Sequence, residues 1–363
     1  MNPTSPLTTR QSNGELVRLL CMLLIVTHHF IVHALYPGTR TLEVQGTGWD
    51  NHLMLAIHCF FYIGVNCFVL LSGWYSIRLK PRSVINLWAI CFFYALIWFA
   101  EKYFHEQVYG DIDIFSWDYL CKVFFPLSHT GLWFMNCYLA LMLLSPVLNA
   151  AIGSLSKRQY QWAIVLSTVL CLWFGFFWEA QEMNSSGYST LQFIWLYIIG
   201  GYLRRYCTVE WLQRHRRQML WTYVGCSLLW GVIAMLQAYG IIQCDQWRPF
   251  TYCNPLVVGA AIGFFLFIMS FQFKSRAINW LAASVLAVYI VQESIFRYHW
   301  IGDIAGNWSS SFKAVILPIL SITFMTVVLL ADKLRILLMK PFWKLYDSHI
   351  EPRINNLLQL HKQ

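Results

Sequence analysis

Charged residues are scarce in this chain. Asp, Glu, Lys and Arg make up 12% of its 363 residues, whereas a soluble globular domain carries roughly 25%. A chain with so few charges cannot cover itself with polar side chains in water. A lipid bilayer is the solvent that fits the 58% hydrophobic content. The shortage of charge therefore excludes an ordinary soluble enzyme and predicts an integral-membrane protein.

Several common motifs are also missing. The 11 cysteines contain no CxxC pair, so they are interpreted as small buried residues. No Walker loop, GxSxG elbow or HExxH zinc signature occurs. His28 and His29 have no carboxylate at metal-ligand spacing, which argues against a metal site. The first apolar run is long and is followed by others, so we interpret it as a span and not as a cleavable signal peptide.

Apolar runs recur along the whole chain, and each is long enough to cross a bilayer as a helix, which takes about 20 residues. We predict an all-α bundle in which residues 1–332 form one membrane domain and 333–363 a basic amphipathic tail on the inner leaflet. Gly200 and Gly201 make the sixth span the weakest. The ten predicted transmembrane helices lie near 15–35, 52–76, 84–104, 131–151, 160–178, 188–205, 218–239, 252–272, 279–297 and 312–331.

The basic residues alternate between the two sides of this predicted bundle. With a cytoplasmic N-terminus, nineteen of the 26 Lys and Arg residues fall in inner segments and six in outer segments, and Arg18 lies within the first span. This positive-inside pattern predicts that both termini are cytoplasmic. It also accounts for the net charge of +9, so we expect membrane lipids and not nucleic acid as partners.

The first span carries more polar groups than a lipid-facing helix. At about 100° per residue, Arg18 and His29 lie about 20° apart around the axis, and Glu15 and His33 fall on the same side. His28 points about 80° away. Such a stripe faces a cavity or a partner. The alternatives are a snorkelling Arg18 paired with Glu15, and packed, hydrogen-bonded histidines; His28 and His33 either pack in this way or line the outer mouth of a cavity.

A second candidate is the end of the second span, FVLLSGWYSIRLKPRS. Ser72 and the glycine after it are small enough for close helix packing or a kink. Arg78, Lys80 and Arg82 follow at the predicted inner surface. These cations either anchor the topology or bind a polyanion such as a phosphate group.

Polar residues in two later spans are further candidates for the lining of a cavity. Trp133 is either an interfacial aromatic residue or a cavity residue. Asn136 either makes an interhelical hydrogen bond or contacts a substrate. Tyr289, Gln292 and Glu293 lie in the phrase SVLAVYIVQES, and Glu293 falls near the outer end of its helix.

Together these features resemble the acyltransferase-3 family of bacterial membrane acyltransferases. Arg18 and His29 have the family's spacing of ten residues between them, and FVLLSGWY, LWFMNCYLALMLLSPVLN, YIIGGYLRRY and AASVLAVYIVQES follow in the expected order. The resemblance implies a ten-helix core in the bacterial inner membrane. It also implies transfer of an acyl group, often acetyl, from cytosolic acyl-CoA to a hydroxyl of a surface glycan, such as a lipopolysaccharide or exopolysaccharide, or of its lipid-linked precursor.

The resemblance assigns roles to residues of the first span and differs at two later places. His29 would be the essential histidine and Arg18 the first-span arginine. The family often has Arg-x-x-Arg after the second span, where this chain has basic residues at 78, 80 and 82, and often has His where this chain has Gln292.

The polar residues fit this chemistry. Acyl-CoA would bind as a substrate, with no permanent cofactor, and its phosphates would lie near Arg18 and the basic residues at 78–82. His29 would act as the general base on the sugar hydroxyl, and Glu15 would set the charge of Arg18. A covalent acyl-His29 intermediate is a variant. The alternative function is a transporter or flippase of a lipid-linked saccharide. A glycan polymerase or ligase usually has a large outer loop with Arg or His residues and is disfavoured, because the longest outer connection here, about 105–130, is acidic and of modest length.

Overall fold

The computed structural model contains helices, joined by turns and short connections, and no strand within the residues that it describes. This confirms the predicted all-α class for that part of the chain. The described residues are 11–35, 49–109, 113, 115–129, 131–178, 181–242, 250–294, 301, 304–305 and 308–360.

Six helices in the described part of the chain are each long and apolar enough to cross a bilayer. Their outward surfaces carry many exposed Leu, Val, Ile and Trp side chains, as lipid-facing surfaces do. The chain is therefore a multi-pass membrane protein, while ten crossings and cytoplasmic termini stay predictions. The six helices are α1 (Asn13–Leu35), α4 (Pro81–Tyr109), α7 (Trp133–Ser154), α8 (Lys157–Leu172, continued to Phe177 by a π-helical turn), α12 (Arg216–Ala238) and α17 (Ser310–Leu338).

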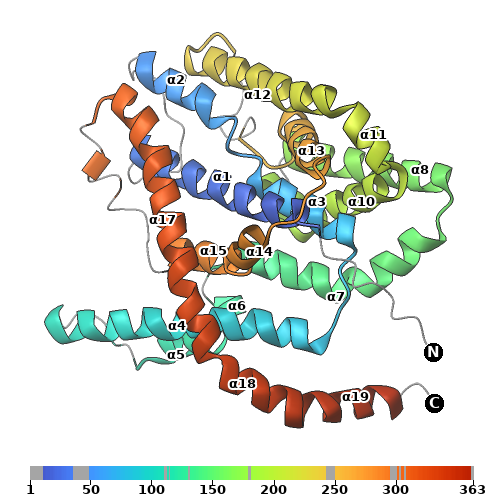
Figure 1. The fold of residues 1–363 in the computed structure, drawn as a ribbon. Coiled ribbons are helices and arrows are strands. Elements are labelled where there is room, and N and C mark those ends of the chain that lie inside the picture. The colour runs from blue at the N-terminus through green and yellow to red at the C-terminus, as the bar shows by residue number, and fades with distance from the viewer. Residues whose placement is uncertain are drawn as a thin grey trace.

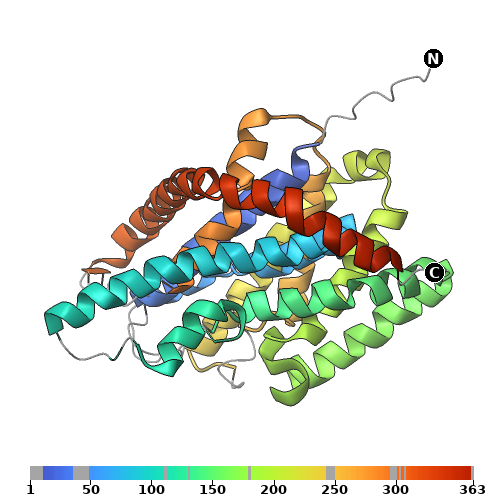
Figure 2. The ribbon, with the colours of Figure 1, turned by 90° about the horizontal axis from the view of Figure 1, so that it is seen from below.

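Shorter helices complete the bundle around α1, which lies between α17 on one side and α3 and α13 on the other (Figure 1). The C-terminal segment, residues 340–360, runs outside the bundle and crosses α4 (Figure 2). The shorter helices are α2 (Trp49–His58), α3 (Gly64–Tyr75), α5 (Trp117–Phe124), α6 (Pro126–His129), α9 (Gln181–Asn184), α10 (Thr190–Tyr206), α11 (Val209–Arg214), α13 (Pro255–Met269), α14 (Arg276–Ala282), α15 (Val285–Ser294), α18 (Lys340–Leu345) and α19 (Glu351–Leu360).

The apolar run near 52–76 is not one helix, which differs from the prediction. It forms α2 and α3, separated by a turn at 59–63 with hydrogen bonds between residues three apart. Helix α3 begins at Gly64, where a Cβ atom would lie 2.7 Å from the carbonyl oxygen of Cys21 in α1. Because α3 touches the α1 backbone at this point, the turn is needed to direct α2 along α12. Hydrophobicity alone carries no signal for such a contact.

The run near 279–297 is also broken, into α14 and α15. A helix end inside the bundle leaves backbone carbonyl groups without intrahelical partners. Lys333 of α17 satisfies one of them, because its Nζ donates to the Trp280 carbonyl oxygen (2.5 Å) and to Ser284 Oγ at the break (2.8 Å). A cation from another helix thus binds polar groups on both sides of the break.

Two glycines let α3 and α10 approach backbone to backbone. A Cβ atom on Gly73 would lie 2.1 Å from the carbonyl oxygen of Tyr197, and one on Gly200 would lie 2.2 Å from that of Leu70. In lipid there is no hydrophobic driving force between helices, so close packing at small residues holds the helices together. Gly200, which made this span the weakest by sequence, therefore holds α10 against α3, and α10 is a continuous helix.

We predict that Gly200→Ala lowers the free energy of unfolding in detergent by about 2 kcal/mol or more, because the new methyl group must push α3 and α10 apart. Denaturation by SDS, followed by tryptophan fluorescence, measures this. Gly153→Ala in α7 is the matched control, since nothing lies within 4 Å of its Cβ position and Ala favours helix. Equal stabilities of the two variants would contradict the close contact.

Candidate active site

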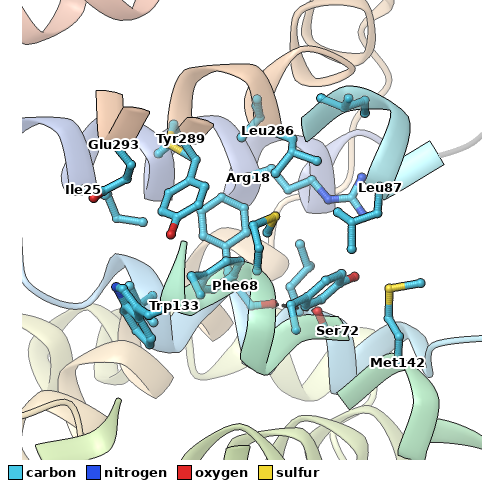
Figure 3. A pocket seen from close by; sticks show the side chains of 18 of the residues that line it. Arg18, Ile25, Phe68, Ser72, Leu87, Trp133, Met142, Leu286, Tyr289 and Glu293 are labelled. Atoms are coloured by element: carbon cyan, nitrogen blue, oxygen red, sulfur yellow. Dashed lines mark hydrogen bonds between the residues drawn. The ribbon is translucent and has the colours of Figure 1, made fainter. Parts of the chain in front are cut away.

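One face of α1 lines a cavity of about 410 Å³. Arg18, Met22, Ile25 and His29 all contribute to its wall, and they follow one another at the spacing of one helix face. Side chains from α3, α4, α7, α14 and α15 close the cavity around this stripe (Figure 3). Two members of the predicted stripe, Arg18 and His29, thus line this cavity, and the rise of the helix places them about 16 Å apart along the axis.

The Arg18 end of the cavity is polar. Arg18 Nη1 donates to both carboxylate oxygens of Glu15, at 2.8 and 3.0 Å. The Arg18 side chain keeps 38% of its surface exposed, whereas that of Glu15 keeps 8%. Ser72 of α3 and Ser83 of α4 line the cavity at the same end. Glu15 therefore holds the guanidinium of Arg18 through an ion pair. It lies about 21 Å from His29 along α1, which is far from the imidazole.

The other end brings His29 and Glu293 together. His29 Nδ1 lies 3.6 Å from Glu293 Oε1, and both side chains are about one quarter exposed, at 21% and 27%. Tyr289 and Trp133 line the same end (Figure 3). The imidazole and the carboxylate are close enough for an ion pair, and the distance between these two atoms is longer than a hydrogen bond.

Aromatic rings form the wall beside this pair. Trp133 lies 4.5 Å from Tyr188 and 5.7 Å from Tyr252 between ring centroids. Tyr252 is held by its carbonyl oxygen, which accepts hydrogen bonds from the side-chain amides of Asn66 (2.9 Å) and Gln192 (3.0 Å). Sequence reasoning missed Tyr188 and Tyr252, since they lie in two separate connections between helices and no periodicity links them.

Four of the residues predicted for the cavity do line it, namely Ser72, Trp133, Tyr289 and Glu293. Four others do not. Asn136 is exposed, since α7 turns Met135 and Tyr138 to the cavity instead. Gln292 is fully buried beside His29.

The two remaining histidines also lie away from the cavity lining. His28 stacks on His58 of α2 with ring centroids 4.6 Å apart, and the Nδ1 of one contacts the Nε2 of the other. His28 was predicted to point about 80° away from the polar stripe of the first span, and this direction accounts for its contact with His58 outside the cavity. His33 is half-buried with its ring 6.4 Å from that of His29. His58 was missed, because only the tertiary contact of α1 with α2 gives it a partner.

The basic residues after α3 divide into two kinds. Arg78 and Lys80 are exposed on the segment 76–80 and have no ion pair with described residues. They lie outside the cavity lining, as does Arg82, but Ser83 and Asn86 in the next turns of α4 belong to it. The positive segment therefore borders the Arg18 end of the cavity.

Arg82, at the start of α4, is held by the C-terminal segment. Its guanidinium contacts the Asp347 carboxylate and lies 3.5 Å from Glu351. It also lies over the rings of Trp343 and Tyr346, at 5.1 and 5.9 Å from their centroids. Two carboxylates and two aromatic faces on one arginine tie the C-terminal segment to α4.

The fold and the cavity together define a membrane protein that holds an imidazole and a carboxylate in a chamber with a cation at its far end. Within the described residues, no three His, Cys, Asp or Glu side chains are grouped as metal ligands would be. The family model described as an acyltransferase domain matches residues 15–331. The chain therefore belongs to the acyltransferase-3 family and is a membrane acyltransferase. No curated protein and no solved structure matches it.

We predict that Arg82→Gln releases the C-terminal segment from α4, because it removes the charge that Asp347 and Glu351 share. Trypsin should then cut at Lys344 several times faster in the purified protein. Arg78→Gln is the control, since Arg78 is exposed and makes no ion pair with described residues. Cleavage of the Arg82 variant at the rate of the control would contradict the tether.

Proposed function

We propose that this protein is a membrane O-acyltransferase that moves an acyl group, acetyl in the first instance, from cytosolic acyl-CoA to a hydroxyl of a surface glycan or its lipid-linked precursor. The observation that carries the proposal is that Arg18 and His29 line the same cavity. In this proposal the protein lies in the bacterial inner membrane with the Arg18 end toward the cytosol.

The Arg18 end suits the phosphates of the donor. Coenzyme A is a polyanion with a long, thin, uncharged arm, and clustered cations stabilise its phosphate groups. Arg18 lines the cavity, while Arg78 and Lys80 are exposed on the segment that borders it. The arm then follows the α1 stripe past Met22 and Ile25, whose apolar side chains suit its uncharged chain, and brings the thioester to His29.

The His29 end suits the transfer step. Glu293 beside Nδ1 favours the tautomer with the proton on Nδ1, so Nε2 is the basic nitrogen. His29 takes the proton of the sugar hydroxyl as its oxygen attacks the thioester carbonyl carbon. The C–S bond then breaks, the coenzyme A thiolate takes the proton from His29, and the ester and free thiol leave. Glu293 stabilises the transient imidazolium, as the third member of a catalytic triad does.

The aromatic wall suits a saccharide acceptor. Trp133, Tyr188 and Tyr252 present large apolar faces with polar edges next to the His29–Glu293 pair, and such side chains bind amphipathic ligands. Tyr188 keeps 42% of its surface exposed, so an acceptor reaches the wall from outside the cavity. The flippase alternative would use the same cavity but requires no imidazole–carboxylate pair.

We predict that His29→Ala lowers acyl transfer at least a hundredfold, because general acid–base catalysis contributes 10² to 10⁴ in rate. Membrane vesicles are supplied with labelled acetyl-CoA, and the label in glycan is counted. Mass spectrometry of surface glycans from cells with and without the gene then gives the mass of the acyl group and its position.

The control is His349→Ala, an exposed residue of the C-terminal segment, at an equal membrane level of protein. Normal transfer by the His29 variant would refute its role as the base. Wild-type vesicles that translocate a lipid-linked saccharide without transferring label would favour the flippase.

We predict that Glu293→Gln lowers kcat about tenfold to a hundredfold with little change in KM for acyl-CoA, because the amide no longer stabilises the imidazolium. Initial rates at varied acetyl-CoA give both constants. Glu101→Gln, an exposed carboxylate paired with the adjacent Lys102, is the control. A rise in KM alone would show that Glu293 binds substrate and does not assist His29.

A further inference from the structure

The segment between α3 and α4 is short, exposed and under local strain. Helix α3 ends at Tyr75, and Ser76 follows with φ of 53°. That value lies in the left-handed region, which costs free energy for a residue other than glycine. A strained, exposed segment keeps one conformation only when other parts of the fold hold it.

A closed ring of hydrogen bonds holds this segment. The backbone N–H of Ile77 donates to the hydroxyl of Tyr197 (2.9 Å), and that hydroxyl donates to Asn149 Oδ1 (2.6 Å). The Asn149 side-chain N–H then donates to the carbonyl oxygen of Ile77 (2.8 Å). Both backbone groups of Ile77 are thus fixed by side chains from two other helices, α10 and α7. We call this ring the Ile77 clamp.

The clamp includes a residue at which the backbones of α3 and α10 are in close contact. The carbonyl oxygen of Tyr197 is the atom that a Cβ on Gly73 would meet at 2.1 Å, so the backbones of α3 and α10 touch at this residue. Tyr197 is 1% exposed, so its ring is packed on all sides. Its hydroxyl therefore reaches Ile77 from a fixed base.

Ile77 is the residue directly before Arg78. The clamp thus fixes the backbone at the residue before Arg78, and the cations of this segment border the Arg18 end of the cavity. Ser83 and Asn86, in the first two turns of α4, belong to the cavity wall. Cations on a fixed backbone lose less conformational entropy on binding an anion than cations on a loose one.

We propose that Tyr197 and Asn149 are positioning residues for the donor: they hold Arg78 and Lys80 where the phosphates of acyl-CoA bind. This inference rests on the proposed function. Neither residue touches the reacting atoms, so their removal affects donor binding and leaves the transfer step unchanged.

The test is Tyr197→Phe, which removes one hydroxyl and keeps the ring. Full-length protein in nanodiscs is titrated with coenzyme A by calorimetry, and KM and kcat are measured with acetyl-CoA. We expect Kd and KM to rise about fivefold, the effect of losing about one hydrogen bond, with kcat unchanged. Asn149→Leu should have a similar effect, and the double variant should be no worse than either single variant, because all three disrupt one ring.

Tyr160→Phe is the matched control. The Tyr160 hydroxyl also donates to α10, to the Ile198 carbonyl oxygen at 2.9 Å, and does not contact the segment 76–80. It should leave Kd within twofold of the wild type. As a readout independent of the donor, trypsin should cut after Arg78 faster in Tyr197→Phe than in Tyr160→Phe.

The outcomes distinguish the positioning role of Tyr197 from the proposed function. If wild-type protein binds coenzyme A and Tyr197→Phe binds it equally well, the positioning role is overturned and the proposed function stands. If the wild type binds no coenzyme A, the proposed function fails and the donor role of the clamp fails with it. A fall in kcat at unchanged Kd would also overturn the inference.

Discussion

A guanidinium inside an apolar helix must have a partner or water, because an unpaired charge in hydrocarbon is costly. Arg18 imposes this constraint on the whole bundle. Its helix, α1, lies at the centre of the fold, and the Arg18 side chain lines the cavity. The surrounding helices leave a cavity there, and Glu15 compensates the charge from the first turn. The cavity thus gives this paired charge a polar surrounding within the membrane bundle.

Backbone polar groups at helix ends and breaks in a membrane also need partners. Basic side chains provide several of them. Arg205 donates to the Ile152 and Leu155 carbonyl oxygens at the end of α7. Arg216 donates to Ser270 at the end of α13. Cations favour the carboxyl ends of helices, where the dipole is negative. Basic residues such as Arg205 and Arg216 were interpreted from the sequence only as topology signals. They therefore also stabilise helix ends of the bundle.

Sequence periodicity sufficed for the cavity face of α1 because the polar residues of that helix share one side. It failed for α7, which is apolar on nearly all sides, so that its sequence does not determine which face turns inward. Asn136 is exposed and Met135 lines the cavity for that reason. Residues such as Tyr188 and His58 acquire their surroundings only from tertiary contacts, and no local pattern contains those contacts. Trp133, an aromatic residue at a predicted helix start, was within reach of sequence reasoning.

Arg78, Lys80 and Arg82 are close in sequence but differ in their contacts, and therefore in what they can bind. Arg82 already has two carboxylates and two aromatic faces from the C-terminal segment, so an incoming phosphate group must compete with them. Arg78 and Lys80 face no such competition from the described residues and lie on the backbone that Tyr197 and Asn149 fix. The family's usual Arg-x-x-Arg spacing is absent here. In this chain two cations are exposed and one is tied to the C-terminal segment, so the first two are the ones that the proposed donor site can use.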